Sequence, residues 1–255
     1  MKAESAPVVS ELLNISGRTA LVTGASGNIG QGIARRLAEA GATIIAHFNT
    51  NESAARKLID NIGGGRIVQA DLSVESDVDA ILDTAKPDYV VNNAAVQTVQ
   101  ALAEQSLDDW RRTLQANLDS AFLVTQRVAN AWRAANTAGA IVNVGSIEAI
   151  DPAAGHGHYA SSKAGLIMLT RAFALEFGDA GIRVNAVSPG LIDRDNLEED
   201  WPEGVSRWRD RAPLRRLGTP KDVADAVLFL LSPAARWISG ANLVVDGGMS
   251  AQSRW

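Results

Sequence analysis

A tyrosine and a lysine stand four residues apart, at Tyr159 and Lys163, in HGHYASSKAGLIMLTRAFALEFG. Side chains at positions i and i+4 of a helix lie on the same face, so the phenol and the ammonium would be neighbours. A free tyrosine has a pKa of about 10, and a nearby cation lowers it by stabilising the phenolate. The pair predicts a group that gives or takes a proton near neutral pH. The alternative is two residues that share a helix face by chance.

Ser146 ends a separate apolar run, GAIVNVGS, thirteen residues before Tyr159. A carbonyl oxygen held by both hydroxyls would be polarised and then protonated. Two histidines, His156 and His158, lie near Asp151 and could suggest a metal. Two histidines at i and i+2 in a glycine-rich loop carry little weight as ligands, so no metal is predicted. We expect His158 to line the rim of the pocket.

The stretch TGASGNIG, residues 23–30, follows the apolar run RTALV and opens a helical pattern. A helix N-terminus offers unpaired N–H groups and a positive dipole end, and small residues let a pyrophosphate approach the backbone. An ordinary tight turn is the alternative. The favoured interpretation is a dinucleotide-binding turn that includes Gly24, Ser26, Asn28, Ile29 and Gly30.

Asn28 stands where the commonest fingerprint of this kind has a glycine, and Gly27 places a glycine one position earlier. If the site needs a left-handed backbone, asparagine is among the best substitutes for glycine. If it needs bare backbone against phosphate, the asparagine side chain must turn away. We predict a usable nucleotide site with altered loop geometry.

Short apolar runs alternate with helical patterns along the chain. The candidate strands are residues 18–24, 42–48, 66–70, 88–94, 139–146, 182–188 and 241–246. They are mostly continuously apolar, as expected for parallel strands covered on both faces. Repeated strand–helix–strand units predict an α/β fold, a Rossmann-type doubly wound parallel sheet of seven strands with helices on both faces. We expect one domain over 1–255, with an N-terminal extension at 1–15, and no element in the closing AQSRW.

Composition excludes several classes of function. A net charge of −5 argues against a nucleic-acid surface. The absence of cysteine excludes disulfides, thiolate catalysis and cysteine-ligated metals. No stretch reaches the roughly 18 apolar residues of a membrane span, and the N-terminus lacks the apolar core of a signal peptide. We expect a cytoplasmic protein with a small-molecule substrate and neither nucleic acid nor membrane as partner.

These motifs together resemble those of classical short-chain dehydrogenases/reductases, from about residue 16 to residue 249. Tyr159 and Lys163 match the family's tyrosine, three residues, lysine motif, and Ser146 matches its catalytic serine. Asn117, in LQANLDSAF, matches the asparagine of the long helix. Further matches are NNAA at 92–95, with Ala95 in place of glycine, PG at 189–190 and VDGG at 245–248.

The resemblance implies a catalytic set and direct hydride transfer between a nicotinamide and an alcohol or carbonyl carbon. Tyr159 would be general acid in reduction and general base in oxidation. Lys163 would lower its pKa and bind the nicotinamide ribose, Ser146 would orient the substrate oxygen, and Asn117 would complete a water path to Lys163.

The same resemblance implies further cofactor contacts. Asp71 and Leu72 would flank the adenine, Asn93 and Ala94 the ribose side. The implied cofactor-binding set is Gly24, Ser26, Asn28, Ile29, Gly30, Asn49, Asp71, Leu72, Asn93, Ala94, Tyr159, Lys163, Pro189, Gly190 and Ile192.

Cofactor choice depends on the end of the second strand, where an acidic residue selects NAD. Phe48 stands at that position in AHFNTNES, and the missing carboxylate favours NADP over NAD. No arginine or lysine follows, and Gly27 occupies a position where NADP users often have a base. His47, Asn49 and Thr50 could supply only neutral or weakly charged contacts.

The segment 193–216 resembles the family's variable substrate lid. It is either a solvated helical flap with Trp201 and Trp208 packing down, or a lid that closes a tryptophan over a polar substrate. Arg194, where the family often has threonine, could contact phosphate or point to solvent. NTAGA and GDAGI contain no base, which weakens a carrier-protein-docking ketoacyl reductase without excluding it.

The sequence predicts an NAD(P)-dependent oxidoreductase for a polar small molecule or a 3-oxoacyl-type compound. One alternative is a catalytically silent nucleotide-sensing binding protein of the same fold. Another is an epimerase or dehydratase of the extended branch, whose members usually carry a longer C-terminal domain. The resemblance also implies a homotetramer or homodimer, with helices in 104–136 and 158–178 at the interface.

Overall fold

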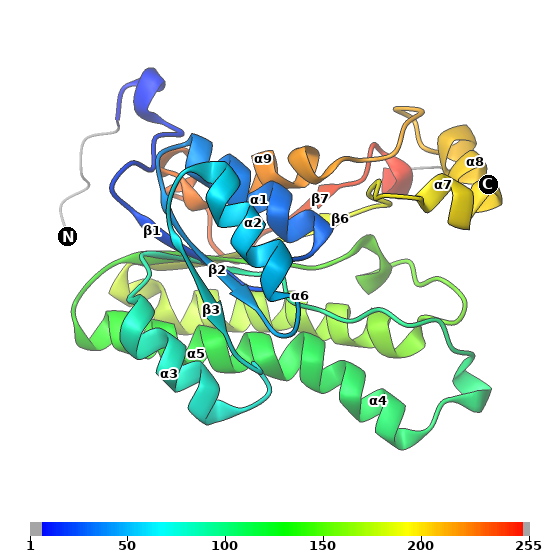
Figure 1. Cartoon of the computed structure of the whole chain (residues 1–255), viewed down its shortest axis with the longest axis horizontal. Coiled ribbons are helices and arrows are strands. Elements are labelled where there is room, and N and C mark those ends of the chain that lie inside the picture. Colours follow the sequence, from blue (N-terminus) through cyan, green and yellow to red (C-terminus); the bar gives the residue numbers. More distant parts are fainter. Residues whose placement is uncertain (1–6, 252–255) are drawn as a thin grey trace.

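The structure is a computed structural model that describes residues 7–251. Its centre is a sheet of seven parallel strands in the order β3-β2-β1-β4-β5-β6-β7 (Figure 1). The predicted doubly wound parallel sheet is confirmed, and every strand lies within a predicted run or one residue beyond it. The strands are β1 Thr19–Val22, β2 Thr43–Phe48, β3 Arg66–Gln69, β4 Tyr89–Asn92, β5 Gly139–Val144, β6 Ile182–Pro189 and β7 Asn242–Val245.

Helices cover both faces of the sheet (Figure 1). One face carries α1 Asn28–Glu39, α2 Glu52–Ile62 and α9 Pro220–Leu231. The other carries α3 Glu75–Ala85, α4 Leu107–Leu114, α5 Ser120–Ala134 and α6 Gly157–Phe177. Two short helices, α7 Leu197–Asp200 and α8 Pro202–Arg211, lie beyond the end of β6.

Two buried clusters explain why the strands read as continuous apolar runs. In β1, Ala20 and Val22 pack in the cluster beneath α1 and α9, whereas Leu21 packs in the cluster beneath α5 and α6. In β5, Val142 likewise packs in the cluster beneath α1 and α9, and Ile141 packs in the cluster beneath α5 and α6. Successive strand side chains point to opposite faces, so both faces need apolar residues when both are covered.

The predicted helical interval 104–136 is helical from Leu107 to Ala134, but it is not one regular helix. A π-helical turn, Gln115–Asp119, joins α4 to α5 and contains Asn117. Single π turns inside helices are frequent at functional sites.

The N-terminal extension predicted at 1–15 is described from residue 7 onward, and residues 1–6 lie outside the described part. Leu12 accepts a hydrogen bond from the Ala234 amide (3.0 Å), and Ile15 donates one to Ala40 (3.1 Å). This part of the extension therefore packs on the α1 and α9 side. Of AQSRW, only Ala251 is described, at the end of a short 3-10 turn. No helix within residues 7–251 is long and apolar enough to cross a membrane.

Candidate active site

The predicted site residues follow the carboxyl ends of parallel strands, which lie at one edge of the sheet. Gly24 follows β1, Asn49 follows β2, Asp71 follows β3, Asn93 follows β4 and Ser146 follows β5. The strand order reverses between β1 and β4, so a crevice at this edge is the position where such sheets bind ligands.

Ser146 and Tyr159 are neighbours in the structure. Ser146 is buried after β5, and its Oγ accepts a hydrogen bond from the Glu148 amide (3.1 Å). Tyr159 lies in the first turn of α6. Burial raises the pKa of Tyr159 to about 12; hydrogen bonding with Ser146 opposes that rise, and the Glu148 charge adds to it.

Lys163 lies one helical turn after Tyr159 and is 2 % exposed. Its Nζ donates to the Val144 carbonyl (2.8 Å) and lies 5.6 Å from the Tyr159 ring centroid. Burial lowers the pKa of Lys163 to about 8. In this structure burial of the phenol is the largest influence on the pKa of Tyr159 and raises it. That Lys163 lowers this pKa stays a prediction.

Asn117 links the π turn to two other segments. Its Oδ1 accepts from the Val96 amide (2.7 Å), and its Nδ2 donates to the Val96 carbonyl (2.9 Å) and to Ser162 Oγ (3.1 Å). The amide side chain thus fixes the loop after β4 to α6, close to Lys163 in sequence. A water path through Asn117 remains a prediction.

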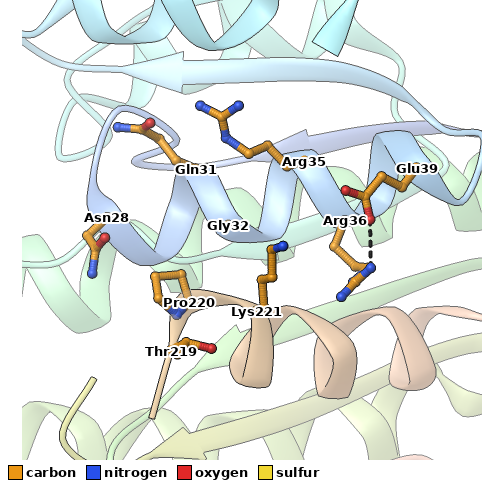
Figure 2. A pocket seen from close by; sticks show the side chains of 9 residues that line it. All are labelled: Asn28, Gln31, Gly32, Arg35, Arg36, Glu39, Thr219, Pro220 and Lys221. Atoms are coloured by element: carbon orange, nitrogen blue, oxygen red, sulfur yellow. Dashed lines mark hydrogen bonds and ion pairs between the residues drawn. The ribbon is translucent and has the colours of Figure 1, made fainter. Parts of the chain in front are cut away.

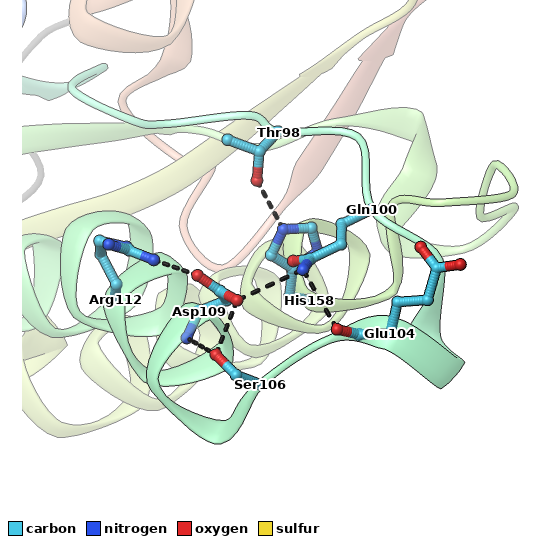
Figure 3. A network of polar contacts seen from close by, with 7 residues as sticks. All are labelled: Thr98, Gln100, Glu104, Ser106, Asp109, Arg112 and His158. Atoms are coloured by element: carbon cyan, nitrogen blue, oxygen red, sulfur yellow. Dashed lines mark hydrogen bonds and ion pairs between the residues drawn. The ribbon is translucent and has the colours of Figure 1, made fainter.

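The loop after β4 is held at two further points (Figure 3). Thr98 Oγ1 lies 2.7 Å from His158 Nε2, and Gln100 Nε2 donates to Asp109 Oδ2 at 3.3 Å. His158 is fully buried, so the expectation that it lines the pocket rim is wrong. Its side chain instead braces the loop after β4 through Thr98.

The glycine turn presents bare backbone. A Cβ at Gly24 would lie 2.8 Å from Ala94 Cα, and one at Gly30 would lie 2.4 Å from the Gly24 carbonyl oxygen. Asn93 Nδ2 donates to the carbonyls of Thr23 (2.9 Å) and Gly24 (3.2 Å), which braces the turn from β4. The first N–H groups of α1 have no helical partner. This cradle fits the pyrophosphate of a dinucleotide.

Asn28 is the first residue of α1 and does not have a left-handed backbone. Its Nδ2 donates to the Asp193 carbonyl (2.7 Å). Of the two sequence alternatives, the structure shows the second, in which the side chain turns away from the backbone. Ser26 and Ile29 flank it; the Ser26 carbonyl accepts from Gln31, and Ile29 packs on the core beneath α1.

His47 has a role that the sequence did not reveal. It is 2 % exposed; its Nδ1 accepts from the Gly24 amide (3.0 Å), and its Nε2 lies 3.2 Å from the Ala70 carbonyl. The ring therefore supports the glycine turn and is not available to a ribose phosphate as the sequence suggested. Burial lowers the pKa of His47, and nearby Asp71 partly opposes the shift.

At the position predicted for the adenine, Asp71 Oδ1 accepts hydrogen bonds from the Ser73 amide (2.9 Å) and hydroxyl (2.7 Å), and Leu72 is buried. Phe48 ends β2 with its side chain buried, so it offers no polar group to a ribose. Asn49 is exposed directly after it.

The residues predicted to contact the nicotinamide follow β6. Pro189 is the last residue of β6, and the Gly190 amide donates a hydrogen bond to the Val245 carbonyl (3.0 Å). A Cβ at Gly190 would lie 2.6 Å from the Trp208 ring, so the tryptophan packs directly against this turn. Ile192 pairs with Gly218 in an isolated bridge.

The segment 193–216 contains α7 and α8, which pack through a small cluster of Leu197, Val205 and Leu217. Trp208 packs down on this cluster, whereas Trp201 is half-exposed. Arg194 Nη1 pairs with Asp200 Oδ2 (2.8 Å), and the arginine side chain is 48 % exposed.

A separate groove of about 410 Å³ runs between α1 and α9 (Figure 2). Asn28, Lys221 and Arg36 are among the residues that line it, and Tyr159 is not. It therefore belongs to the outer face of the glycine turn and not to the catalytic crevice.

Comparisons with known proteins agree with this geometry. A family model described as enoyl-(acyl carrier protein) reductase, of the short-chain dehydrogenase/reductase type, matches residues 24–250. The 3beta-hydroxysteroid dehydrogenase 1 of Eggerthella lenta is 35% identical over 248 residues, which cover 93% of this chain and 95% of that protein. Glucose 1-dehydrogenase 2 of Bacillus subtilis is 34% identical over 248 residues, or 93% and 96% of the two chains.

A solved structure is equally similar. It is that of a candidate NAD(P)-dependent gluconate 5-dehydrogenase from Beutenbergia cavernae, with NADP bound at low occupancy. Its TM-score is 0.88 at 33% identity, covering 94% of this chain and 100% of that one. The matching residues, the sheet order and the arrangement at its carboxyl edge lead to one conclusion: the chain belongs to the short-chain dehydrogenase/reductase family and is an oxidoreductase of that family.

Proposed function

We propose that the protein transfers a hydride between NADP and an alcohol or carbonyl group of a polar small molecule. The observation that carries the proposal is the meeting of Ser146, Tyr159 and Lys163 beside a glycine turn of bare backbone. Ser146 binds and polarises the substrate oxygen, and Tyr159 gives that oxygen a proton in reduction or takes one in oxidation. Asn117 and Lys163 support the proton path.

A bound nicotinamide supplies or accepts the hydride at the substrate carbon. In oxidation, the carbinol carbon loses its hydride and the hydroxyl loses its proton to Tyr159, which leaves a carbonyl. Lys163 holds the nicotinamide ribose in this proposal, and the amides of the first turn of α1 hold the pyrophosphate. Trp208, which packs on Gly190, excludes water from the nicotinamide end.

NADP is favoured over NAD because the second strand ends in Phe48, whose side chain is buried and uncharged. No carboxylate repels a 2′-phosphate there. Exposed Asn49 and Thr50 provide neutral hydrogen-bonding groups after the strand. The NADP in the similar structure from Beutenbergia cavernae agrees with this preference.

The alternative is a nucleotide-sensing protein without catalysis. The presence of all four residue types, Asn117, Ser146, Tyr159 and Lys163, favours the enzyme.

We also propose a homotetramer or homodimer, since large apolar side chains are exposed on α5, α6 and around β7: Phe122, Met168, Leu175, Trp237, Leu243 and Val244. The cytoplasmic location predicted from composition is retained as part of this proposal.

The test is nicotinamide absorbance with NADPH and NADH against sugars, short ketones, ketoacyl thioesters and steroids. Turnover with a carbonyl or alcohol, faster with NADPH, is the expected result. Tight dinucleotide binding without turnover on any panel member would favour the sensing protein. Equal or better rates with NADH would contradict the cofactor preference.

A further inference from the structure

A polar cluster that the catalytic set does not use lies beside Tyr159. Glu148 comes from the 3-10 turn after Ser146, His156 precedes the first turn of α6, and Gln97 lies in the loop after β4. Glu148 Oε2 lies 2.8 Å from His156 Nδ1, and Gln97 Nε2 donates to Glu148 Oε1 at 3.3 Å. Gln97 Nε2 also lies 3.5 Å from His156 Nδ1. His156, eight residues further along the chain, and Gln97, from a distant loop, thus meet at the Glu148 carboxylate.

The cluster faces the reacting hydroxyls. The His156 and Tyr159 rings meet edge to face with centroids 6.3 Å apart. The Glu148 amide donates to Ser146 Oγ, and the Glu148 charge is close enough to raise the pKa of Tyr159. A substrate whose oxygen contacts Ser146 and Tyr159 therefore binds next to Glu148 and His156.

The charge of the cluster selects among substrates. The Glu148 and His156 side chains are each 16 % exposed. Within residues 7–251 the only salt-bridge contact of Glu148 is with His156, whose ring carries a positive charge only when it is protonated. Lys163 points to Val144 and Arg194 to Asp200, so neither neutralises the carboxylate. Two carboxylate oxygens accept about four hydrogen bonds, which leaves acceptor capacity for a ligand.

We propose that Gln97, Glu148 and His156 form the substrate-recognition site and select a neutral polyhydroxylated compound, a sugar or a polyol. Hydroxyls next to the reacting carbon donate to Glu148, and His156 and Gln97 exchange further hydrogen bonds with them. An acid would meet the charge of Glu148, and an apolar substrate would bury that charge without compensation. This inference rests on the proposed oxidoreductase activity.

The first experiment measures kcat/KM of the NADP-loaded enzyme for oxidation of D-glucose and D-sorbitol, of the anion D-gluconate, of the cation D-glucosamine and of a hydroxysteroid. We expect a neutral polyol to be preferred. Glu148→Gln is expected to lower kcat/KM for the neutral polyol at least tenfold, mainly by raising KM. It should also reduce the ratio of kcat/KM for the polyol to kcat/KM for gluconate. His156→Asn is expected to act in the same direction.

The matched control is Glu104→Gln, which removes an exposed carboxylate at the end of the 3-10 turn Leu102–Glu104, further along the loop that carries Gln97. It should leave kcat/KM unchanged. Glu148→Gln should also move the Tyr159-dependent limb of the pH profile to lower pH, which a merely structural role would not do. NADPH affinity should be the same in all variants.

The outcomes separate this inference from the proposed activity. A preference for gluconate, glucosamine or the steroid that Glu148→Gln leaves unchanged overturns the recognition site, while the oxidoreductase proposal stands. If no substrate is turned over, saturation-transfer NMR measures the binding of D-sorbitol to the NADP-loaded protein. Binding that Glu148→Gln abolishes would support the site even if the protein were no enzyme, and unchanged or absent binding would overturn it.

Discussion

At the scale of single residues, Tyr159, the proposed proton donor, has a pKa that favours one direction of the proposed reaction. The pKa of Tyr159 is raised to about 12, so the phenol is protonated at neutral pH and ready to act as an acid. Reduction needs the protonated phenol, whereas oxidation needs the phenolate.

We therefore expect kcat/KM for alcohol oxidation to rise continuously from pH 7 to pH 10, by about tenfold per pH unit at most. Carbonyl reduction should not rise over this interval. Deprotonation of Lys163, whose pKa is about 8, should affect both directions through ribose binding. Initial rates at saturating NADP and NADPH test this. A bell-shaped oxidation profile with a maximum near pH 7 would contradict the assignment.

His47 makes a second prediction at this scale. Burial holds the native pKa of His47 below its ordinary value of about 6.5, so the unfolded chain binds the proton first as pH falls. The stabilisation is complete above about pH 6.5 and is lost as pH falls from there toward the native pKa. Protonation also removes the acceptor for the Gly24 amide. His47→Gln should lose this part of the pH dependence.

The measurement compares thermal unfolding of wild type and His47→Gln at pH 7.5 and pH 5.5. The wild-type melting temperature should fall more than that of the variant, by about 2–4 °C for each 1 kcal/mol of linkage. NADPH affinity of the wild type should weaken in the same interval. Parallel pH dependence in both proteins would show that His47 does not titrate as described.

At the scale of elements, the β1–turn–α1 unit depends on absent side chains. Gly30→Ala would place a Cβ 2.4 Å from the Gly24 carbonyl oxygen and 2.8 Å from Asn93 Nδ2, so the turn must move. We expect at least a tenfold loss of NADPH affinity and a lower melting temperature. Gly64→Ala is the control, since a Cβ there meets nothing within 4 Å. Fluorescence titration of NADPH distinguishes them, and equal affinities would contradict the cradle.

The elements themselves were readable from the sequence, and some of their details were not. Continuous apolar runs such as ATIIAHF predicted strands because both faces of the sheet are covered. The π turn at Asn117 was missed because it breaks no apolar periodicity. Asn28 was left with two alternatives because its partner, the Asp193 carbonyl, is 165 residues away.

Long-range partners also explain what was wrong. His47 looked free to meet a phosphate, but its ring nitrogens contact the Gly24 amide, just after β1, and the Ala70 carbonyl, just after β3. Arg194 could not be assigned because Asp200 reaches it only when α7 forms. The residues proposed as catalytic were recognised from their resemblance to the family's motifs, whereas the cluster of Gln97, Glu148 and His156 exists only when their segments meet in the fold.

At the scale of the whole molecule, the apolar side chains exposed around the edge strand β7 predict an interface with another copy of the chain. Trp237 is 97 % exposed and lies just before β7, whose Leu243 and Val244 are partly exposed. An exposed edge of this kind is a common protein interface. We expect a mass in solution of two or four times 26.9 kDa.

Trp237→Glu should reduce that assembly by at least one step, from tetramer to dimer or from dimer to monomer. Val74→Glu, at an apolar position before α3, serves as the control and should leave the mass unchanged. Sedimentation equilibrium measures both. A wild-type monomer, or a variant with unchanged mass, would contradict this interface.

The most direct test of the central claim compares the only two tyrosines of the chain. Tyr159→Phe removes the proposed proton donor, and Tyr89→Phe removes a hydroxyl on β4, away from the crevice. With the best carbonyl substrate and NADPH, we predict a fall in kcat of about 10²–10⁴-fold for Tyr159→Phe, unchanged NADPH affinity, and near-wild-type kcat for Tyr89→Phe. Full turnover by Tyr159→Phe would contradict the account.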